Sequence, residues 1–566
     1  MTETEKARTP VAGSGRRTRD GGAVAFLILL SLLLFFHRLG SLALFDADEP
    51  AFAEAAREML VSGDWITPQF NFQPRFDKPI LFYWLIILAY KAFGIGEFAA
   101  RFWSALFATA LVLSIYLLGR QVLGRRGALI AAMAFATNLG TVVLARAAVT
   151  DMTLTFLMTW TLFCFFGASR ATGRTGGRYV LIGYGVMALS VLTKGPIGLL
   201  IPGLVIGLFL AIRRGAGASL SRVRPLLGLS IFAAIALPWY LLVVRENGWD
   251  FIYGFIVKHH LVRYSGVVSG NAGAPYYFLP VVLLGFFPWS AMLPKAFGDL
   301  WTIRMKLRGD LTAREEFLLF SWLWFGVVFV FFSLSGTKLP SYIFPAFPAL
   351  AMLAGAAGES LLDEGTGAGG FGKAFDWVVG GISCSLGVVL ALVPWIAGNI
   401  RLKDAPDIPP FQFGLAPYAL AVLFLAGSAI AVRARRRRRG NVALVALATS
   451  TVLSILLVIQ WVAPVVEERL QTALRDFAHT ARRELGPPDL LTAYDLNAPS
   501  LVFYARRPVV KVARCEEARF RTLAASAGRL FIIAKAGSVP RLREVPDIFP
   551  LDRRWGYVLY SSRQRR

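Results

Sequence analysis

The sequence contains few charged residues and very few cysteines. Only 17% of its 566 residues are Asp, Glu, Lys or Arg, and 56% are hydrophobic, whereas soluble globular domains carry about 25% charged residues. The low charge excludes an ordinary soluble domain, and the abundance of apolar residues excludes a disordered chain. The three cysteines, Cys164, Cys384 and Cys515, show no spacing typical of a disulfide framework or a metal motif.

Several catalytic and binding signatures are also missing. Without an HExxH, GxSxG or Walker A motif, zinc hydrolysis, serine hydrolysis and ATP-driven transport have no positive signal. Acidic residues number 35 against 60 Lys and Arg, which gives a formal charge of +25. No nucleic-acid-binding pattern accompanies this charge, so we expect the cationic loops to face anionic membrane lipids. The sequence therefore predicts neither a nucleic-acid partner nor a nucleotide cofactor.

Apolar runs of about 17 to 24 residues are abundant, and this length spans a bilayer as a helix. They predict a polytopic α-helical membrane protein with thirteen spans, at residues 23–40, 97–119, 127–145, 151–168, 178–193, 196–212, 225–244, 276–296, 316–334, 341–357, 374–397, 414–432 and 441–463. The run Pro79–Phe93 is shorter and is predicted to be an interfacial or re-entrant helix.

The distribution of Lys and Arg predicts the orientation. With thirteen spans, most basic segments, including Arg435 to Arg439, lie on the cytoplasmic side, as the positive-inside rule requires. Residues 1–22 are then a cytoplasmic N-terminus and residues 23–463 a transmembrane domain with outer loops at 41–96 and 245–275. Residues 464–566 form a small outer α/β domain, with strands expected at 490–494, 509–512, 530–534 and 557–560 and helices at 467–485 and 515–525.

Ionisable residues gather at the outer ends of the predicted spans, where a charge is costly unless it serves a site. The set comprises Asp48, Glu49, Asp77, Lys78, Asp151, Lys194, His260, Arg263, Lys338 and Tyr342. Taken singly, Asp48 could be no more than the cap of a helix, and each lysine could simply extend to the lipid head groups. Because the inner face is expected to hold arginines without matching carboxylates, the outer set favours a functional site.

The residue types in this set suit the chemistry of a phosphate leaving group. Lys and Arg bind phosphate, and Lys78, Lys194 and Arg263 could stabilise the charge that develops on it. A nearby carboxylate could orient or deprotonate a hydroxyl, or bind a divalent cation. His260 and Arg263 are three residues apart and would share a helix face. Nucleotides are scarce outside a cell membrane, so we expect a lipid-borne donor.

The segments that carry these residues resemble a known family. The first-loop sequence DADEPAFAEAAREMLVSGDWITPQFNFQPRFDKPILFYWL and the segment GEFAARFWSAL are similar to those of GT-C glycosyltransferases in the superfamily of ArnT and the protein O-mannosyltransferases. The similarity is closest to the aminoarabinose transferases that modify lipid A. It continues in the segments ARAAVTDM, LTKGPIGLLIP, KHHLVRY, SGTKLPSYIFPAFPALA and APSLVFYARRPVV.

The resemblance implies a GT-C fold and transfer of a sugar from an undecaprenyl-phosphate carrier at the periplasmic face of the bacterial inner membrane. The implied sugar is 4-amino-4-deoxy-L-arabinose, and the implied acceptor is lipid A or another envelope component. Asp48 matches the catalytic acid, with Glu49 beside it, while Lys78 and Arg263 match residues that hold the carrier phosphate. Further site residues implied by the resemblance are Asp151, which we group with the catalytic acids, and Lys194, Lys338 and Tyr342, which we group with the binding residues.

The chain departs from the family pattern at two places, and other functions stay open. Asp77 replaces a Glu; with His260 it could form a divalent-metal site (Zn²⁺, Mg²⁺ or Mn²⁺), which the shorter side chain puts in question. Ala51 and Phe52 replace an Arg-Tyr pair, which could indicate a different acceptor. The alternatives are a protein O-mannosyltransferase-type or other envelope-glycan transferase, a flippase for a lipid-linked sugar, and a structural or binding protein.

Overall fold

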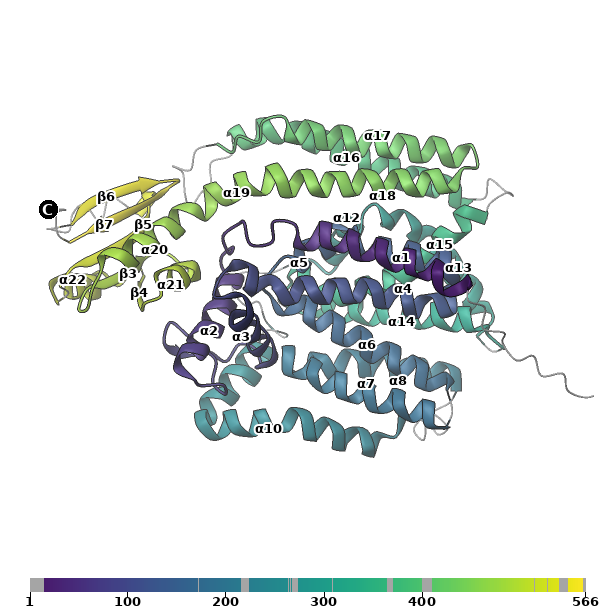
Figure 1. Ribbon diagram of the computed structural model, residues 1–566, viewed down its shortest axis with the longest axis horizontal. Coiled ribbons are helices and arrows are strands. Elements are labelled where there is room, and N and C mark those ends of the chain that lie inside the picture. The colour runs from purple at the N-terminus through teal and green to yellow at the C-terminus, as the bar shows by residue number, and fades with distance from the viewer. Residues whose placement is uncertain are drawn as a thin grey trace, which may run out of the picture.

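The computed structural model describes residues 15–562 apart from 172, 215–222, 263, 265, 267–272, 308, 364–369, 400–409, 514, 527 and 539–547. Long helices lie side by side in a bundle, and a small α/β domain lies beyond one end of it (Figure 1). The two helices of the first loop, α2 (Asp48–Ser62) and α3 (Leu81–Phe93), lie at that same end. The first loop and the C-terminal domain therefore share one end of the bundle.

Each of the thirteen predicted spans overlaps helical structure. The helices of the bundle are α1 (Gly15–Ser31), η1 (Leu32–Phe36), α4 (Glu97–Ala136), α5 (Leu139–Ala145), α6 (Thr150–Arg170), α7 (Gly173–Lys194), α8 (Ile197–Arg214), α10 (Pro225–Phe251), η2 (Ile252–Val262), α12 (Phe278–Gly285), η3 (Trp289–Met292), α13 (Leu293–Met305), α14 (Ala313–Leu334), η4 (Pro340–Ala346), α15 (Phe347–Asp363), α16 (Gly370–Asn399), α17 (Ala416–Arg436) and α18 (Gly440–Leu457).

The number of spans differs from the prediction when length and composition alone are counted. Within the described residues, nine helices are long and apolar enough to cross a membrane, or ten if the bent pair α12 and α13 is one span. Two predicted spans, at α1 and α8, fall among the shorter apolar helices. Two others, 97–119 and 127–145, meet in α4, whose backbone breaks at Gly124 with a φ of 74°. The count of thirteen stays a prediction.

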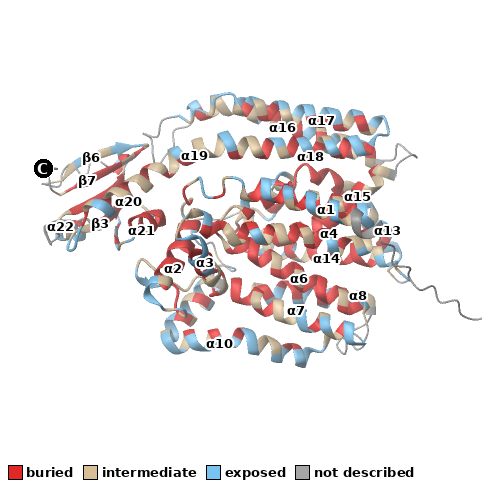
Figure 2. Cartoon of the chain, in the orientation of Figure 1, coloured by how far each residue is buried: buried red, intermediate tan, exposed pale blue. Residues whose placement is uncertain are grey.

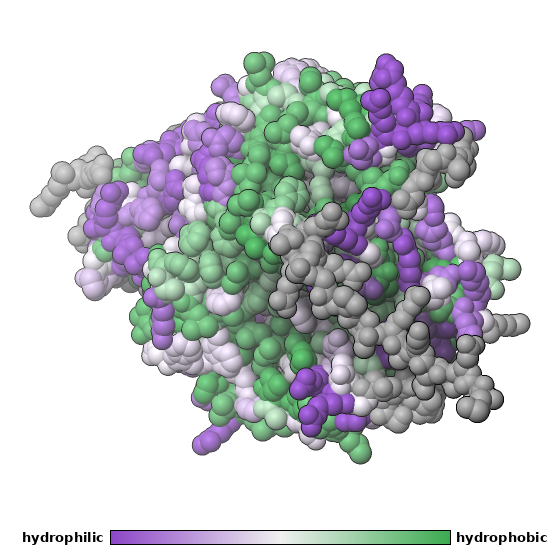
Figure 3. All heavy atoms as spheres, turned by 45° about the vertical axis from the view of Figure 1, so that its right-hand side comes forward, coloured by the Kyte–Doolittle hydropathy of each residue, from purple (hydrophilic) through white to green (hydrophobic). Residues whose placement is uncertain are grey.

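Burial separates central helices from peripheral ones. Within their most apolar stretches, α6 and the helix Pro340–Leu362 are 83% and 89% buried, whereas α16 and the helix Pro225–His259 are 17% and 22% buried. Figure 2 shows the same contrast between α6 and α10. The exposed residues of the peripheral helices are largely apolar, and Figure 3 shows apolar side chains across the middle of one face, with hydrophilic groups toward its ends. This is the surface of a protein that lies in a bilayer.

The first loop folds into a compact unit rather than an extended connection. The predicted short helix at 79–93 is confirmed as α3, whose Tyr83 packs against Phe52 of α2. Between the two helices, the short strands β1 (Gln69–Phe70) and β2 (Gln73–Pro74) form an antiparallel hairpin. Glu58 of α2 accepts hydrogen bonds from the backbone N–H groups of Asn71 and Phe72, both at 2.8 Å. The loop therefore holds its hairpin in a defined position.

The C-terminal domain has a mixed five-stranded sheet in the order β4-β3-β5-β7-β6. Its strands are β3 (Leu490–Tyr494), β4 (Val509–Val512), β5 (Leu530–Lys535), β6 (Phe549–Arg554) and β7 (Tyr557–Ser561), and its helices are α20 (Thr472–Glu484), α21 (Pro499–Ala505) and α22 (Glu517–Ser526). Strands β3, β4 and β5 are parallel, and β7 pairs antiparallel with both β5 and β6.

The sequence predicted four of these strands, and its predicted helices at 467–485 and 515–525 correspond to α20 and α22. It missed β6 and α21. The bundle connects to the domain through η5 (Val458–Val462) and α19 (Ala463–Leu470), which continue α18 as a single helical run from Gly440 to Glu484.

Candidate active site

Four charged residues of the first loop form one electrostatic cluster. Arg75 binds Asp77 through two hydrogen bonds, from Nε to Oδ1 at 2.6 Å and from Nη2 to Oδ2 at 2.7 Å. The positive charge of Lys78 lowers the pKa of Asp77, and Asp48 interacts electrostatically with Arg75. Asp48 is exposed and is the first residue of α2. The N-cap of this helix is Ala47, and no side chain caps it by a hydrogen bond. Its carboxylate therefore does not serve as the helix cap.

The charges in this cluster keep Asp77 ionised. Burial alone would raise the pKa of Asp77, but the charge and hydrogen bonds of Arg75 outweigh it and hold the pKa well below its usual value. Because both carboxylate oxygens bind Arg75, they do not fit metal ligation in this arrangement. Among the described residues, no group of three His, Cys, Asp or Glu side chains could hold a metal. The side chain of His260 lies outside those residues, so the metal site with Asp77 stays a prediction.

A second cluster joins three residues that the sequence placed in the site. Lys194, the last residue of α7, donates a 2.8 Å hydrogen bond from Nζ to Oδ1 of Asp151 at the start of α6. The same ammonium lies 5.6 Å from the centre of the Tyr342 ring. Residues from three separate parts of the chain thus meet at one end of the bundle, where a cation lies between a carboxylate and an aromatic face.

Glu49, the sequence neighbour of Asp48, binds the segment that leads to Asp151 of the second cluster. Its carboxylate accepts 2.8 Å and 2.7 Å hydrogen bonds from Arg101, a 2.9 Å bond from the N–H of Phe45 and a 2.7 Å bond from the N–H of Ala148. Ala148 lies three residues before Asp151. Burial alone would raise the pKa of Glu49, but the charge and hydrogen bonds of Arg101, with the two backbone bonds, outweigh it. The pKa is therefore below its usual value and the carboxylate stays charged. These four bonds occupy Glu49 in holding α2 against α4 and the start of α6.

The remaining predicted residues lie around the turn after α14 or outside the described residues. Lys338 is buried and donates a hydrogen bond from Nζ to the carbonyl oxygen of Ser335. The N–H of Gly336 donates to the carbonyl oxygen of Tyr264 at 2.8 Å, so this turn contacts the segment that was predicted as the 245–275 loop. Arg263 lies outside the described residues. The structure therefore neither brings Arg263 to the cluster nor separates it.

The C-terminal domain packs directly on the first loop. Tyr504 of α21 accepts a 3.0 Å hydrogen bond from the N–H of Leu44 and donates one of 3.0 Å to Glu97. The N–H of Ser500 donates to Asp46 at 2.8 Å. Burial, the largest effect, raises the pKa of Asp46 to about 6, although the bonds from Ser500 oppose it. The small domain thus helps to hold the loop that carries Asp48.

The expectation that the arginines of the opposite end lack carboxylates was wrong. Glu316 binds Arg213 at 3.2 Å and also pairs with Arg170 at the end of α6, and Asp376 binds Arg435 at 2.6 Å. Acidic residues therefore occur at both ends of the bundle, because basic side chains at span ends need counter-charges. The predicted outer set likewise forms two clusters, one within the first loop and one that joins α6, α7 and Tyr342.

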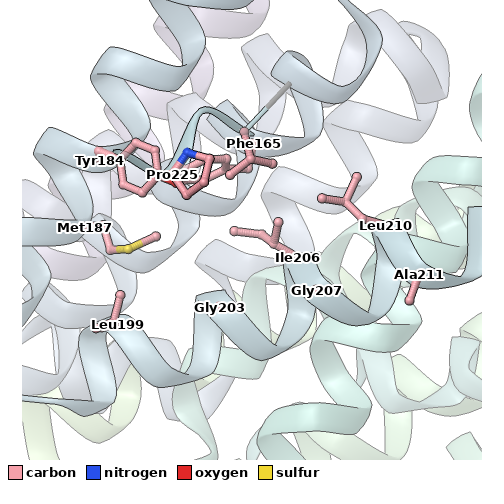
Figure 4. A pocket seen from close by; sticks show the side chains of 11 residues that line it. Phe165, Tyr184, Met187, Leu199, Gly203, Ile206, Gly207, Leu210, Ala211 and Pro225 are labelled. Atoms are coloured by element: carbon pink, nitrogen blue, oxygen red, sulfur yellow. The ribbon is translucent and has the colours of Figure 1, made fainter. Parts of the chain in front are cut away.

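An apolar pocket of about 340 Å³ lies beside α7. Figure 4 shows its lining, in which Phe165 of α6, Tyr184 and Met187 of α7, and Ile206 of α8 surround the space. Almost no polar atom lines it, so a ligand there would be apolar. Most of its lining belongs to α8, and Tyr184 and Met187 belong to α7, the helix that ends at Lys194.

Sequence reasoning missed three residues that organise this region. Arg75 and Asp77 are two apart in the sequence, a spacing that in extended backbone places side chains on one face and could have indicated their pairing. Arg101 is an arginine near the start of an apolar span, a signal for a buried partner. Lys511 of β4 carried no local signal, because only folding of the C-terminal domain brings it near the first loop.

Comparison with solved structures places this arrangement in a class of enzymes. ArnT from Cupriavidus metallidurans, solved with undecaprenyl phosphate, is similar with a TM-score of 0.79 and 26% sequence identity, over 96% of this chain and 98% of the other. The oligosaccharyltransferase of Archaeoglobus fulgidus has a TM-score of 0.52 at 13% identity, over 92% of this chain and 70% of the other, which is a likeness of fold alone. The fold is that of the GT-C membrane glycosyltransferases.

Comparison of sequences narrows the class to a family. The family model for dolichyl-phosphate-mannose-protein mannosyltransferases matches residues 77–241. The undecaprenyl phosphate-alpha-4-amino-4-deoxy-L-arabinose arabinosyl transferase of Edwardsiella ictaluri is 32% identical over 402 residues, 70% of each chain. That of Erwinia tasmaniensis is 31% identical over 413 residues, covering 72% of this chain and 71% of its own. The chain belongs to this ArnT-like family of glycosyltransferases.

Proposed function

We propose that the chain transfers 4-amino-4-deoxy-L-arabinose from undecaprenyl phosphate to a phosphate group of lipid A, at the periplasmic face of the bacterial inner membrane. The observation that carries the proposal is the presence of two charged clusters at one end of the bundle, with Lys78 and Lys194 as cations and Asp48 and Asp151 as carboxylates. The names of the similar transferases and the undecaprenyl phosphate in the similar structure support this choice of donor.

The chemistry follows from these side chains. The acceptor oxygen forms a bond to the anomeric carbon of the sugar while the bond between that carbon and the carrier phosphate breaks. The electron pair leaves with undecaprenyl phosphate, whose charge Lys78 and Lys194 stabilise. A phosphate acceptor is already anionic, so Asp48 needs only to orient it or the sugar. A hydroxyl acceptor would instead lose its proton to Asp48.

The apolar pocket beside α7 supports a lipid-borne donor. A polyprenyl chain is apolar along its length, and the pocket lining is apolar. Because α7 ends at Lys194, a carrier with its phosphate near that lysine can run along the helix toward the pocket. This path would keep the isoprenoid within the bundle while the sugar faces the periplasm.

The test is the structure of lipid A in cells that lack the gene and in cells that regain it. Mass spectrometry is expected to show aminoarabinose on lipid A only in wild-type and complemented cells, with donor retained on undecaprenyl phosphate in the deletion strain. If lipid A is unaltered in the deletion strain and another envelope component loses its sugar, that component is the acceptor and lipid A is not. Accumulation of donor on the cytoplasmic leaflet alone would instead support a flippase.

A further inference from the structure

Two cations from different parts of the chain lie beside one aromatic ring. The guanidinium carbon of Arg75 is 5.6 Å from the centre of the Phe70 ring, and the ammonium nitrogen of Lys511 is 5.7 Å from it. Arg75 also lies 5.1 Å from the Phe52 ring. Phe70 belongs to the first-loop hairpin and Lys511 to the edge strand β4. Both cations therefore lie beside Phe70, at the seam between the first loop and the C-terminal domain, and each feels the other's charge.

Hydrogen bonds on both sides fix this seam. The side chain of Asn71 donates to the carbonyl oxygen of Val509 at 3.0 Å and accepts from the N–H of the same residue at 2.8 Å. Val509 is two residues before Lys511 in β4, and Asn71 follows Phe70. Because Glu58 holds the other side of the hairpin turn, Lys511 and Phe70 are brought together by rigid elements and not by flexible side chains alone.

The nearby carboxylates do not occupy all the hydrogen-bond donors of Arg75 and Lys511. Nε and Nη2 of Arg75 bind Asp77, whereas Nη1 is buried and has no hydrogen-bond partner in the described part of the chain. Asp48 interacts with Arg75 only through its charge. Lys511 is exposed and donates a 3.1 Å hydrogen bond to Asn497, with Asp46 nearby. A buried donor without an acceptor is costly, and like charges beside one ring repel, so both features favour a bound anion.

We propose that Arg75 and Lys511 form a subsite for a phosphate monoester of the acceptor lipid, with Phe70 as its wall. This inference rests on the proposed function and names the group by which the acceptor is held. A phosphate there would relieve the repulsion between the two cations, and it would accept a hydrogen bond from Nη1 of Arg75 once the atoms that cover Nη1 move aside. Lys511 lies outside the helical bundle, whereas the carrier phosphate is assigned to Lys78 and Lys194. The subsite is thus on the acceptor side.

Binding measurements on the full-length chain in nanodiscs test the subsite without requiring turnover. The probes are phosphorylated lipid A, the same lipid with its phosphates removed, and undecaprenyl phosphate. Lys511→Gln is expected to weaken binding of phosphorylated lipid A about fivefold and Arg75→Lys about tenfold, because each removes a charge-assisted contact. Neither variant is expected to change the affinity for dephosphorylated lipid A. Arg519→Gln, which removes an exposed charge of α22, is the matched control.

The outcomes separate the subsite from the proposed function. The inference is overturned if Lys511→Gln leaves the affinity for phosphorylated lipid A unchanged, or if it weakens the binding of undecaprenyl phosphate by the same factor. It is also overturned if the wild-type chain binds phosphorylated and dephosphorylated lipid A with equal affinity. If Arg75→Lys fails to fold, Lys511→Gln and the charge reversal Lys511→Glu decide alone. A chain that binds phosphorylated lipid A through this subsite but transfers no sugar would contradict the proposed function and leave the subsite standing.

Discussion

Glu49 and Asp48 are neighbours in sequence but differ in what their carboxylates contact. Glu49 is buried and bound by Arg101 and two backbone N–H groups, whereas Asp48 is exposed at the start of α2. A carboxylate whose oxygens are all occupied positions its surroundings, and an exposed one can meet a ligand. We therefore assign Glu49 to positioning and keep Asp48 as the proposed catalytic residue.

Replacement of Glu49 by alanine is expected to destabilise the fold more than any exposed substitution. Glu49→Ala leaves Arg101 buried without its counter-charge, and breaking such a pair costs about 3–5 kcal/mol. Thermal unfolding of the purified protein in detergent measures the change. Glu468→Ala, an exposed acidic residue of α19, is the control and is expected to stay within about 0.5 kcal/mol of wild type. A Glu49→Ala protein as stable as this control would contradict the positioning role.

Sequence reasoning found most of the residues that meet at the end of the bundle next to the C-terminal domain, because ionisable groups at span ends are conspicuous. It placed Asp151 with the catalytic acids and Lys194 and Tyr342 with the binding residues of the same site, and the structure brings these three together. It did not separate Glu49 from Asp48, since residue type and spacing do not tell which carboxylate is enclosed by hydrogen-bond donors. That distinction needs Arg101 and Ala148, which come close only after α4 and α6 have packed.

At the scale of elements, apolar length predicted helices better than it predicted their breaks. The spans around α6 and α14 were placed within a few residues, because a long apolar run has few alternatives in a bilayer. The bend of 104° between α12 and α13 was not predicted. In the C-terminal domain, β6 was missed because it has the mixed sequence FPLDRR, without the apolar pattern of a buried strand.

The contact between α21 and the first loop gives the fold a pH dependence. Folding raises the pKa of Asp46 from 3.8 to about 6, so between these values the folded chain binds a proton that the unfolded chain has released. The stability from this proton is complete below about pH 4 and is lost as the pH rises through about 6.

The unfolding temperature of Asp46→Asn is therefore expected to change less than that of wild type between pH 4 and 6, because the amide does not titrate. Asp310→Asn, at an exposed position, serves as the control and should retain the wild-type profile. Parallel profiles for wild type and Asp46→Asn would show that Asp46 does not titrate at this seam.

At the scale of the whole molecule, the bundle, the first loop and the C-terminal domain each contribute to one region. The bundle supplies Asp151 and Lys194, the loop supplies Asp48, Arg75 and Lys78, and β4 supplies Lys511. The general GT-C architecture could be predicted from the sequence. The meeting of loop and domain could not, because it depends on pairs such as Asn71 and Val509 that are 438 residues apart.

The most direct test of the account is sugar transfer by the purified chain in liposomes. Undecaprenyl-phosphate aminoarabinose and phosphorylated lipid A are supplied, and the modified lipid A is measured by mass spectrometry. We predict product with wild type, and a loss of at least about a hundredfold in rate for Lys78→Gln, because the leaving phosphate loses its charge stabilisation. Lys373→Gln, at the far end of the bundle on α16, should retain full activity. No product with wild type, or an unchanged rate in Lys78→Gln, would contradict the account.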